Sequence, residues 1–183
     1  VLMLGFGASV IARRISRISL TFFALTLAAA VWMLAFTPMY CARDTATALF
    51  WARMAYFGVP FIAPAIYHFA VEMLHIAKER RNEKYMGWLL ALIFSVMASS
   101  TDLLVDRVQH YWWGYYPRYS AIISVPFLTF FFGYLIAALA EFIRAYPASR
   151  GVERKRIRLL LIGFGIAYVG CVDYLPKFGF AVY

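Results

Sequence analysis

The sequence predicts an all-α protein, a polytopic membrane helix bundle with six helices present of an expected seven. Apolar residues make up 64% of the chain and charged residues only 15%, against about 45–50% and 25% in soluble globular proteins. The charges are separated by long charge-free runs. Arg and Lys gather in every second connection between those runs. We interpret residues 1–183 as one transmembrane domain.

The first element is the charge-free run 1–12, which is followed by Arg13, Arg14 and Arg17. A secretory signal peptide has the opposite order, with basic residues before the apolar core. We therefore interpret this run as the first membrane helix. It is too short to span a bilayer, and the chain begins without Met, so we expect it to be the tail of a longer helix.

Four longer charge-free runs follow and predict spanning helices. They cover residues 18–42, 54–71, 85–101 and 119–140. A helix rises about 1.5 Å per residue, so roughly 20 residues cross a hydrocarbon core of about 30 Å. Strands of a membrane barrel would alternate apolar and polar side chains, and these runs do not. We expect helices at about 20–40, 49–77, 85–101 and 119–142.

The predicted helix at 49–77 is the least ordinary of these. Pro60 and Pro64 in its interior remove backbone donors and kink it. A last apolar run predicts a sixth helix at about 157–172. Its glycines indicate close packing against a neighbouring helix.

Most of the 18 Lys and Arg residues lie in the first, third and fifth connections. They are Arg13, Arg14, Arg17, Lys78, Arg80, Arg81, Lys84, Arg144, Arg150, Arg154, Lys155, Arg156 and Arg158. Because positive residues stay on the cytoplasmic side, we expect these connections to face the cytoplasm. The N-terminus, residues 41–47, the aromatic stretch 109–120 and the C-terminal end then face outward. Topology thus accounts for the net charge of +9, and we predict no nucleic-acid partner.

The number of helices has a topological consequence. Six helices that start outside also end outside. If the C-terminus is to reach the cytoplasm, a seventh helix has to follow Tyr183. We therefore expect the chain to be a fragment that lacks its last helix.

The stretch QHYWWGYYPRYS, residues 109–120, has a high density of aromatic residues for a connection. Trp and Tyr gather at membrane interfaces because the ring is apolar and its polar atom stays wet. Interface anchoring accounts for part of the stretch. Gly114 and Pro117 indicate a turn, so we expect the segment to fold back as a lid over the mouth of the bundle. Aromatic side chains with a few polar groups also line pockets for small ligands.

Arg53 lies near an outward helix end. It can pair with Asp102 or Asp173 from other helices, or it can bind an anionic ligand; we favour the pairing. Cys41 and Cys171 also lie at outward helix ends, where an oxidising compartment allows a disulfide. The sequence does not give the Cα separation that a bridge requires, and we favour unpaired cysteines.

His68, Glu72 and His75 follow one another at i, i+4 and i+7, which places them on one helix face. Such a set can hold a transition metal or give an axial ligand to a haem. Alternatively, Glu72 and His75 lie in the interface and His68 packs against a neighbouring helix. We favour the second interpretation and predict no cofactor. The chain has no CxxC, HExxH or GxSxG motif and no P-loop.

Three pieces of the chain resemble one known family. They are ALFWARMAYFGVPFIAPAIYHFAVEML (residues 48–74), HYWWGYYPRYS (110–120) and RIRLLLIGFGIAYVGCVDYLPKFGFAVY (156–183). The first opens on an aromatic–Trp–Ala–Arg group, the second carries Trp–Gly–Tyr–Tyr–Pro, and the third ends in a Leu–Pro–x–x–Gly turn. In order and spacing they resemble the N-terminal seven-helix membrane region of bacterial sensor histidine kinases, which is also found ahead of diguanylate cyclase and PAS or GAF domains.

The resemblance implies a signal-input domain in the bacterial inner membrane. Its partners would be the lipid bilayer, a cytoplasmic transmitter domain of the same polypeptide, a second copy in a homodimer and an unknown small or amphiphilic ligand. The chain would not itself be an enzyme. We predict that an outward-facing site consists of Trp51, Arg53, Trp112, Trp113, Tyr115, Tyr116 and Asp173.

Two other functions stay open at this point. One is a membrane redox or metal protein that uses His68 and His75. The other is a small transporter, against which the charge-free middles of the helices argue, because a transporter needs a hydrophilic path through the bilayer.

Overall fold

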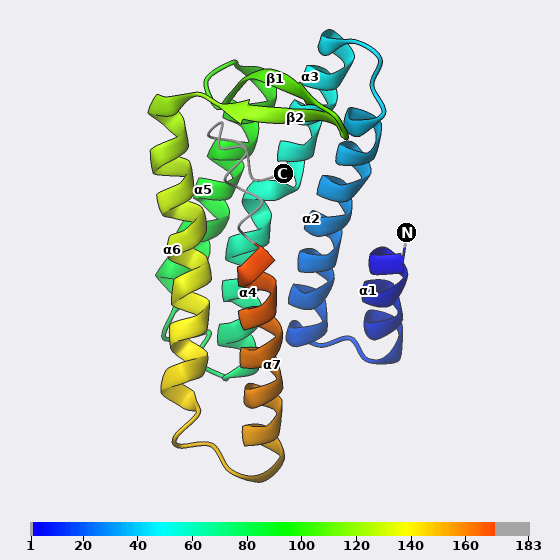
Figure 1. The fold of residues 1–183 in the computed structure, drawn as a ribbon. Coiled ribbons are helices and arrows are strands. Elements are labelled where there is room, and N and C mark those ends of the chain that lie inside the picture. The colour runs from blue at the N-terminus through cyan, green and yellow to red at the C-terminus, as the bar shows by residue number, and fades with distance from the viewer. Residues whose placement is uncertain (1, 171–183) are drawn as a thin grey trace.

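A bundle of helices carries one small β-hairpin across one of its ends (Figure 1). The structure, a computed structural model, describes residues 2–170, with only the backbone of Ala121 and Ile122. In chain order the elements are α1 (Leu2–Arg13), α2 (Arg17–Tyr40), α3 (Thr45–Met54), a 3₁₀ turn η1 (Ala55–Phe57), α4 (Val59–Met73), α5 (Arg81–Ser100), β1 (Val105–Tyr111), β2 (Gly114–Tyr119), α6 (Ala121–Ala145) and α7 (Gly151–Val169). The predicted all-α bundle is confirmed.

Helix α4 lies at the centre of the bundle, where it contacts α2, α5 and α6. Three segments are long and apolar enough to cross a membrane, namely Arg17–Tyr40, Thr45–Met73 and Ile123–Ala145. In an 18-residue stretch of the middle segment 72% of the residues are buried, against 33% in such a stretch of each of the other two. Helices α2 and α6 therefore turn much of their apolar surface outward, as helices do where lipid surrounds them.

The helix predicted at about 49–77, with kinks at Pro60 and Pro64, is divided and shorter at its end in the structure. Three elements, α3, η1 and α4, follow one another in its place, and α4 ends at Met73. Pro60 falls in the first turn of α4, where its missing N–H costs no hydrogen bond. Gly58 lies against α2, and a Cβ there would stand 2.3 Å from the Ala28 carbonyl oxygen. The break in the helix and a close approach to α2 thus coincide at Gly58.

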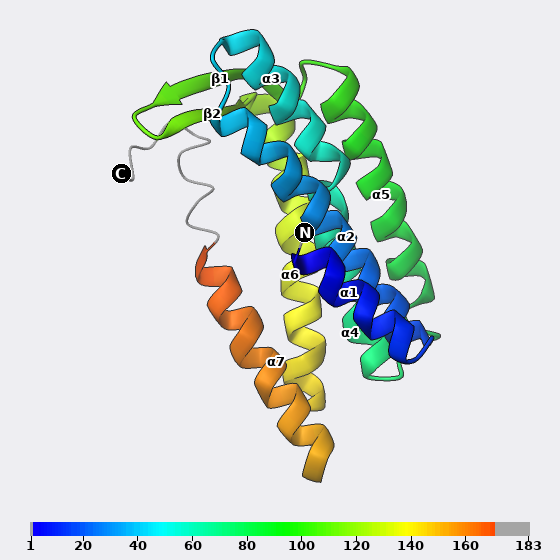
Figure 2. The same cartoon turned by 90° about the vertical axis from the view of Figure 1, so that its right-hand side faces the viewer.

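Three of the four runs predicted to span lie in membrane-length segments. The fourth, 85–101, forms most of α5, whose first turn carries the charged residues Arg81, Glu83 and Lys84. This turn lowers the mean hydropathy of α5, which is not among the three segments. Helix α1 has 12 residues, as short as predicted, and packs along α2 (Figure 2).

The two strands between α5 and α6 were not predicted from the sequence. They pair antiparallel through a two-residue turn, Trp112 and Trp113. Gly114, the first residue after the turn, has a φ of +129°, a conformation that favours glycine. A Cβ on Gly114 would also stand 2.7 Å from the Tyr40 carbonyl oxygen, so the hairpin lies directly against the end of α2.

The predicted turn at Gly114 and Pro117 is therefore placed differently in the structure. Pro117 lies inside β2, opposite Val108. Each strand of a two-stranded sheet has a free edge, so a residue without an N–H is tolerated there. The segment does lie across the end of the bundle, as predicted (Figure 1).

The three basic connections lie toward one end of the bundle and the hairpin lies at the other (Figures 1 and 2). These connections join α1 to α2, α4 to α5 and α6 to α7. The positive-inside pattern requires this arrangement, because the connections on one side of a membrane must share an end of the bundle. Helix α7 lies beside α6, and the Tyr168 hydroxyl donates a hydrogen bond to the Leu135 carbonyl oxygen at 3.0 Å.

Candidate functional site

The hairpin rests on the end of α2 through packed aromatic rings. The Trp113 ring lies edge-on to Tyr40, with centroids 5.7 Å apart, and to Tyr116, at 5.4 Å. Tyr116 is only 1% exposed and meets Phe36 of α2 at 6.2 Å. Aromatic pairs of this geometry contribute about 0.5–1.5 kcal/mol beyond the area that they bury. Trp113 and Tyr116 therefore hold the hairpin on the bundle.

A second contact joins the hairpin to the interior. The hydroxyl of Tyr56, in η1, donates a hydrogen bond to the hydroxyl of Tyr119, at the end of β2. Both residues are buried, and both rings pack on Phe127 of α6. Breaking a hydrogen bond between buried groups is costly, because neither group then finds water. The hairpin, η1 and α6 thus meet at one polar contact inside an apolar core.

Arg53, near the end of α3, binds the hairpin and the loop before it. Its Nε donates a hydrogen bond to the Val105 carbonyl oxygen at 3.3 Å, and its Nη2 forms an ion pair with Asp102. The predicted pairing with Asp102 is confirmed. The Asp102 side chain is 77% exposed, so water screens the ion pair and its contribution to stability is small. The bond to the strand carbonyl is the contact that fixes β1 over α3.

The remaining predicted site residues in the described part of the chain are Trp51 in α3 and Trp112 and Tyr115 in the hairpin. Trp51 and Tyr115 are partly buried and pack against the core of the bundle. Trp112 is 85% exposed in the turn. Tyr115 faces His110 across the hairpin, with ring centroids 4.7 Å apart, and Trp51 packs against Phe50 at 5.4 Å. Of these side chains, Trp112 is the one that the fold leaves open to a ligand.

Two predictions concern residues outside the described part of the chain. They are Asp173, as a site residue, and Cys171, as a potential partner of Cys41. Cys41 is exposed directly after α2, at the hairpin end of the bundle. The pairing state of the two cysteines stays a prediction.

A family model described as the N-terminal 7TM region of histidine kinase matches residues 1–183, the whole chain. The chain belongs to this family. The resemblance carried by the three quoted pieces is thereby confirmed, and the chain is a sensor region of histidine kinases. No curated protein and no solved structure gives a significant match.

A polar network lies at the other, basic end of this sensor region. Glu72 on α4 accepts a hydrogen bond from Lys84 on α5 at 3.4 Å, and its carboxylate lies 3.3 Å from Nε2 of His68. The Trp88 indole donates a hydrogen bond to Nδ1 of His68 at 3.1 Å. Glu72 and Lys84 are each only 9% exposed, so each charge depends on the other for its stabilisation. The network joins α4 to α5.

The predicted grouping of His68, Glu72 and His75 on one helix face is wrong. Helix α4 ends at Met73, and His75 has a φ of +61° in the turn that follows. His75 is exposed, whereas Glu72 and Trp88 engage the two ring nitrogens of His68. Within residues 2–170, no group of three or more His, Cys, Asp or Glu side chains is placed to hold a metal ion.

A second buried carboxylate forms ion pairs with basic residues at the basic end of the bundle. Glu141 on α6 is 8% exposed and pairs with Arg80 at 2.9 Å and with Arg144 at 3.4 Å. The nearby Glu141 carboxylate raises the pKa of Arg80 above its ordinary value, so the guanidinium stays charged. The connection between α4 and α5 is thereby tied to α6.

Lys84, Trp88 and Glu141 are partners that the sequence analysis missed. Lys84 and Glu141 border the charge-free runs 85–101 and 119–140. The charge count uses Lys84 only as a topology signal. A charged residue at the border of an apolar run can also pair with a charged residue at the end of a neighbouring helix. The position of Lys84 and Glu141 at such borders was the signal that could have indicated these pairs.

Proposed function

We propose that this sensor region perceives a small or amphiphilic ligand, or the state of the membrane, at its hairpin end. It then signals to a cytoplasmic kinase part of the same polypeptide. The hairpin end faces outward and the basic connections face the cytoplasm of a bacterial inner membrane. The site is formed or capped by Trp51, Arg53, Trp112, Trp113, Tyr115, Tyr116 and Asp173.

The observation that carries the proposal is the buried hydroxyl pair of Tyr56 and Tyr119. It links the hairpin to η1, and η1 leads directly into α4. Near its other end α4 holds Glu72, which is paired with Lys84. A mostly buried segment therefore runs from the aromatic hairpin to the basic end. Because this segment is packed and makes specific contacts at both ends, it can switch between two discrete packing arrangements and so couple the two ends.

A ligand bound at the hairpin favours one arrangement of this segment and shifts an equilibrium that exists without ligand. The break at Gly58 divides the segment into a part under the hairpin and a part that crosses the bundle. In a homodimer, a change in one bundle alters its contact with the other copy and hence the two kinase parts.

Trp112→Ala tests the sensing role. Trp112 is 85% exposed, so its removal deletes the open ring and leaves the packed face of the hairpin intact. We expect the response of the full-length kinase to fall about fivefold, as the loss of one aromatic contact of about 1 kcal/mol predicts. The measurement is a transcriptional reporter of kinase output across a panel of small and amphiphilic compounds.

Leu89→Ala is the matched control, because Leu89 is a large apolar residue, 53% exposed, in the middle of α5. It should respond as the unaltered kinase does. If Trp112→Ala keeps the full response to every compound that activates the unaltered kinase, the hairpin does not sense.

A further inference from the structure

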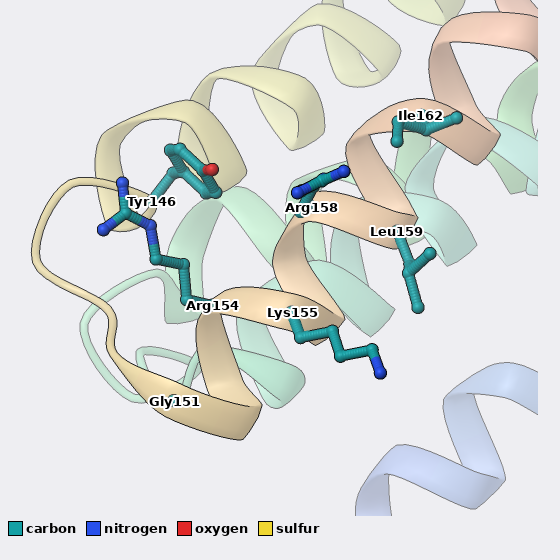
Figure 3. A pocket seen from close by; sticks show the side chains of 7 residues that line it. All are labelled: Tyr146, Gly151, Arg154, Lys155, Arg158, Leu159 and Ile162. Atoms are coloured by element: carbon teal, nitrogen blue, oxygen red, sulfur yellow. The ribbon is translucent and has the colours of Figure 1, made fainter.

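The basic end carries a pocket between the end of α6 and the start of α7 (Figure 3). Its volume is about 380 Å³, and its walls include Tyr146, three basic residues and two apolar ones. The Arg154 guanidinium lies over the Tyr146 ring, 4.8 Å from the ring centroid. A cation–π contact of this kind orients the cation while leaving its N–H groups able to bind an anion.

Among the described residues, no carboxylate pairs with the basic residues of the pocket. Elsewhere at this end of the bundle, Glu141 pairs with two arginines and Glu72 pairs with a lysine. In the part of the chain that the structure describes, no ion pair reaches Arg154, Lys155 or Arg158. Three like charges within about one helical turn repel one another, and a bound anion relieves this repulsion.

Apolar surface continues the pocket along α7. Leu159 and Ile162 line it and are 60% and 50% exposed. Helix α6 has 25 residues and is therefore about 37 Å long, which exceeds the hydrocarbon core of about 30 Å. Its end at Tyr146 thus reaches the headgroup layer. The cations then lie beside the headgroups, and the apolar pair lies beside the acyl chains.

We propose that this pocket binds an anionic phospholipid, with its phosphate among Arg154, Lys155 and Arg158 and an acyl chain along Leu159 and Ile162. Guanidinium groups bind phosphate oxygens through paired hydrogen bonds, and basic pockets between membrane helices recognise lipid headgroups. The step from charged to apolar lining favours a lipid over a soluble phosphate. This site lies at the end opposite the hairpin, so the proposal goes beyond ligand sensing and does not depend on it.

Binding of spin-labelled phosphatidylglycerol to the protein in phosphatidylcholine nanodiscs tests this proposal. Arg154→Gln with Arg158→Gln removes two cations of the pocket. Arg150→Gln with Arg156→Gln removes two cations of the same segment that do not line it. We expect the affinity to fall about tenfold in the pocket variant and less than about twofold in the matched variant. Should the pocket variant not fold, Lys155→Gln alone is expected to lower the affinity about threefold.

Three results would overturn the proposal. An equal loss in both double variants would mean that net charge alone attracts the lipid. An unchanged affinity in the pocket variants would mean that the lipid binds elsewhere. Displacement of the labelled lipid by millimolar inorganic phosphate would make the pocket a soluble-anion site, whereas we expect inorganic phosphate to leave the lipid bound.

Discussion

Glu72 and Lys84 carry opposite charges into a part of the bundle where neither side chain has much contact with water. Each side chain is 10% exposed, and the paired atoms are 3.4 Å apart. Moving a charge out of water costs several kcal/mol, and the partner offsets this cost only while both charges are present. The pair therefore specifies how α4 meets α5 more than it adds to stability.

Glu72→Met should destabilise the protein by about 3 kcal/mol, because it leaves the Lys84 ammonium buried without a partner. Thermal unfolding in detergent micelles, followed by circular dichroism, measures the effect as a lower Tm. Glu72→Met combined with Lys84→Met removes both charges and should recover most of the loss. If the single variant is as stable as the unaltered protein, the pair is solvated and does not fix the two helices.

Trp112 and Trp113 show what the sequence can and cannot predict about single residues. Their composition and position predict a place at the membrane interface for both. The two neighbours nevertheless differ, since Trp112 is 85% exposed whereas Trp113 packs on Tyr40 and Tyr116. The turn decides this difference, and a Trp–Trp pair is not one of the dipeptides that mark a hairpin turn. Residue types therefore grouped these residues as one set, and the fold divides the set into packing residues and an open one.

The crossing of α2 and the segment from η1 to α4 depends on the missing side chain of Gly58. A Cβ there would lie 2.3 Å from the Ala28 carbonyl oxygen and 2.9 Å from the Trp32 backbone nitrogen. Both atoms belong to the backbone of α2, so no side-chain rotation can make room. Any larger residue has to push the two elements apart.

Gly58→Ala should destabilise the protein by about 2 kcal/mol through this forced separation. Gly163→Ala is the matched control, because no atom of residues 2–170 lies within 4 Å of a Cβ on that residue of α7. Alanine has the higher helix propensity, so the control should be unchanged or slightly more stable. Thermal unfolding of the two variants side by side measures the difference, and equal Tm values would contradict the close crossing.

At the scale of elements, the sequence predicts the helices better than their interruptions. Charge-free runs identify helices because a backbone in lipid must satisfy its own hydrogen bonds. The break at Gly58 depends on the neighbouring helix α2, which no local pattern describes. The hairpin is missed for a different reason: its alternation is weak, and Pro117 argues for a turn when considered alone. Only the paired strand shows why a proline is tolerated there.

Of the three membrane-length segments, the least apolar one lies at the centre of the bundle. An 18-residue stretch of Thr45–Met73 has a mean hydropathy of 1.4 and 72% of it is buried, whereas such a stretch of Arg17–Tyr40 has 2.1 and 33% of it is buried. A helix surface that faces lipid has to be apolar, because lipid tails cannot pair with polar groups. A surface that faces other helices can include polar groups such as Glu72, because neighbouring side chains pair with them. The predicted topology rests on the same physics applied to the connections, and the shared end of the basic connections agrees with it.

In the proposed mechanism, docking of the hairpin on η1 is coupled to kinase output. Tyr119→Phe removes the hydroxyl that accepts from Tyr56 and keeps the ring in place. A buried hydrogen bond contributes about 1 kcal/mol, so its loss should change the ratio of two arrangements about fivefold. Tyr85→Phe removes a hydroxyl from an exposed tyrosine on α5 and is the matched control.

The direct measurement is the autophosphorylation rate of the full-length kinase in nanodiscs without added ligand. We expect Tyr119→Phe to shift this rate about fivefold from that of the unaltered protein, and Tyr85→Phe to leave it unchanged. If Tyr119→Phe is folded and autophosphorylates at the same rate as Tyr85→Phe and the unaltered kinase, the hairpin is not coupled to the output.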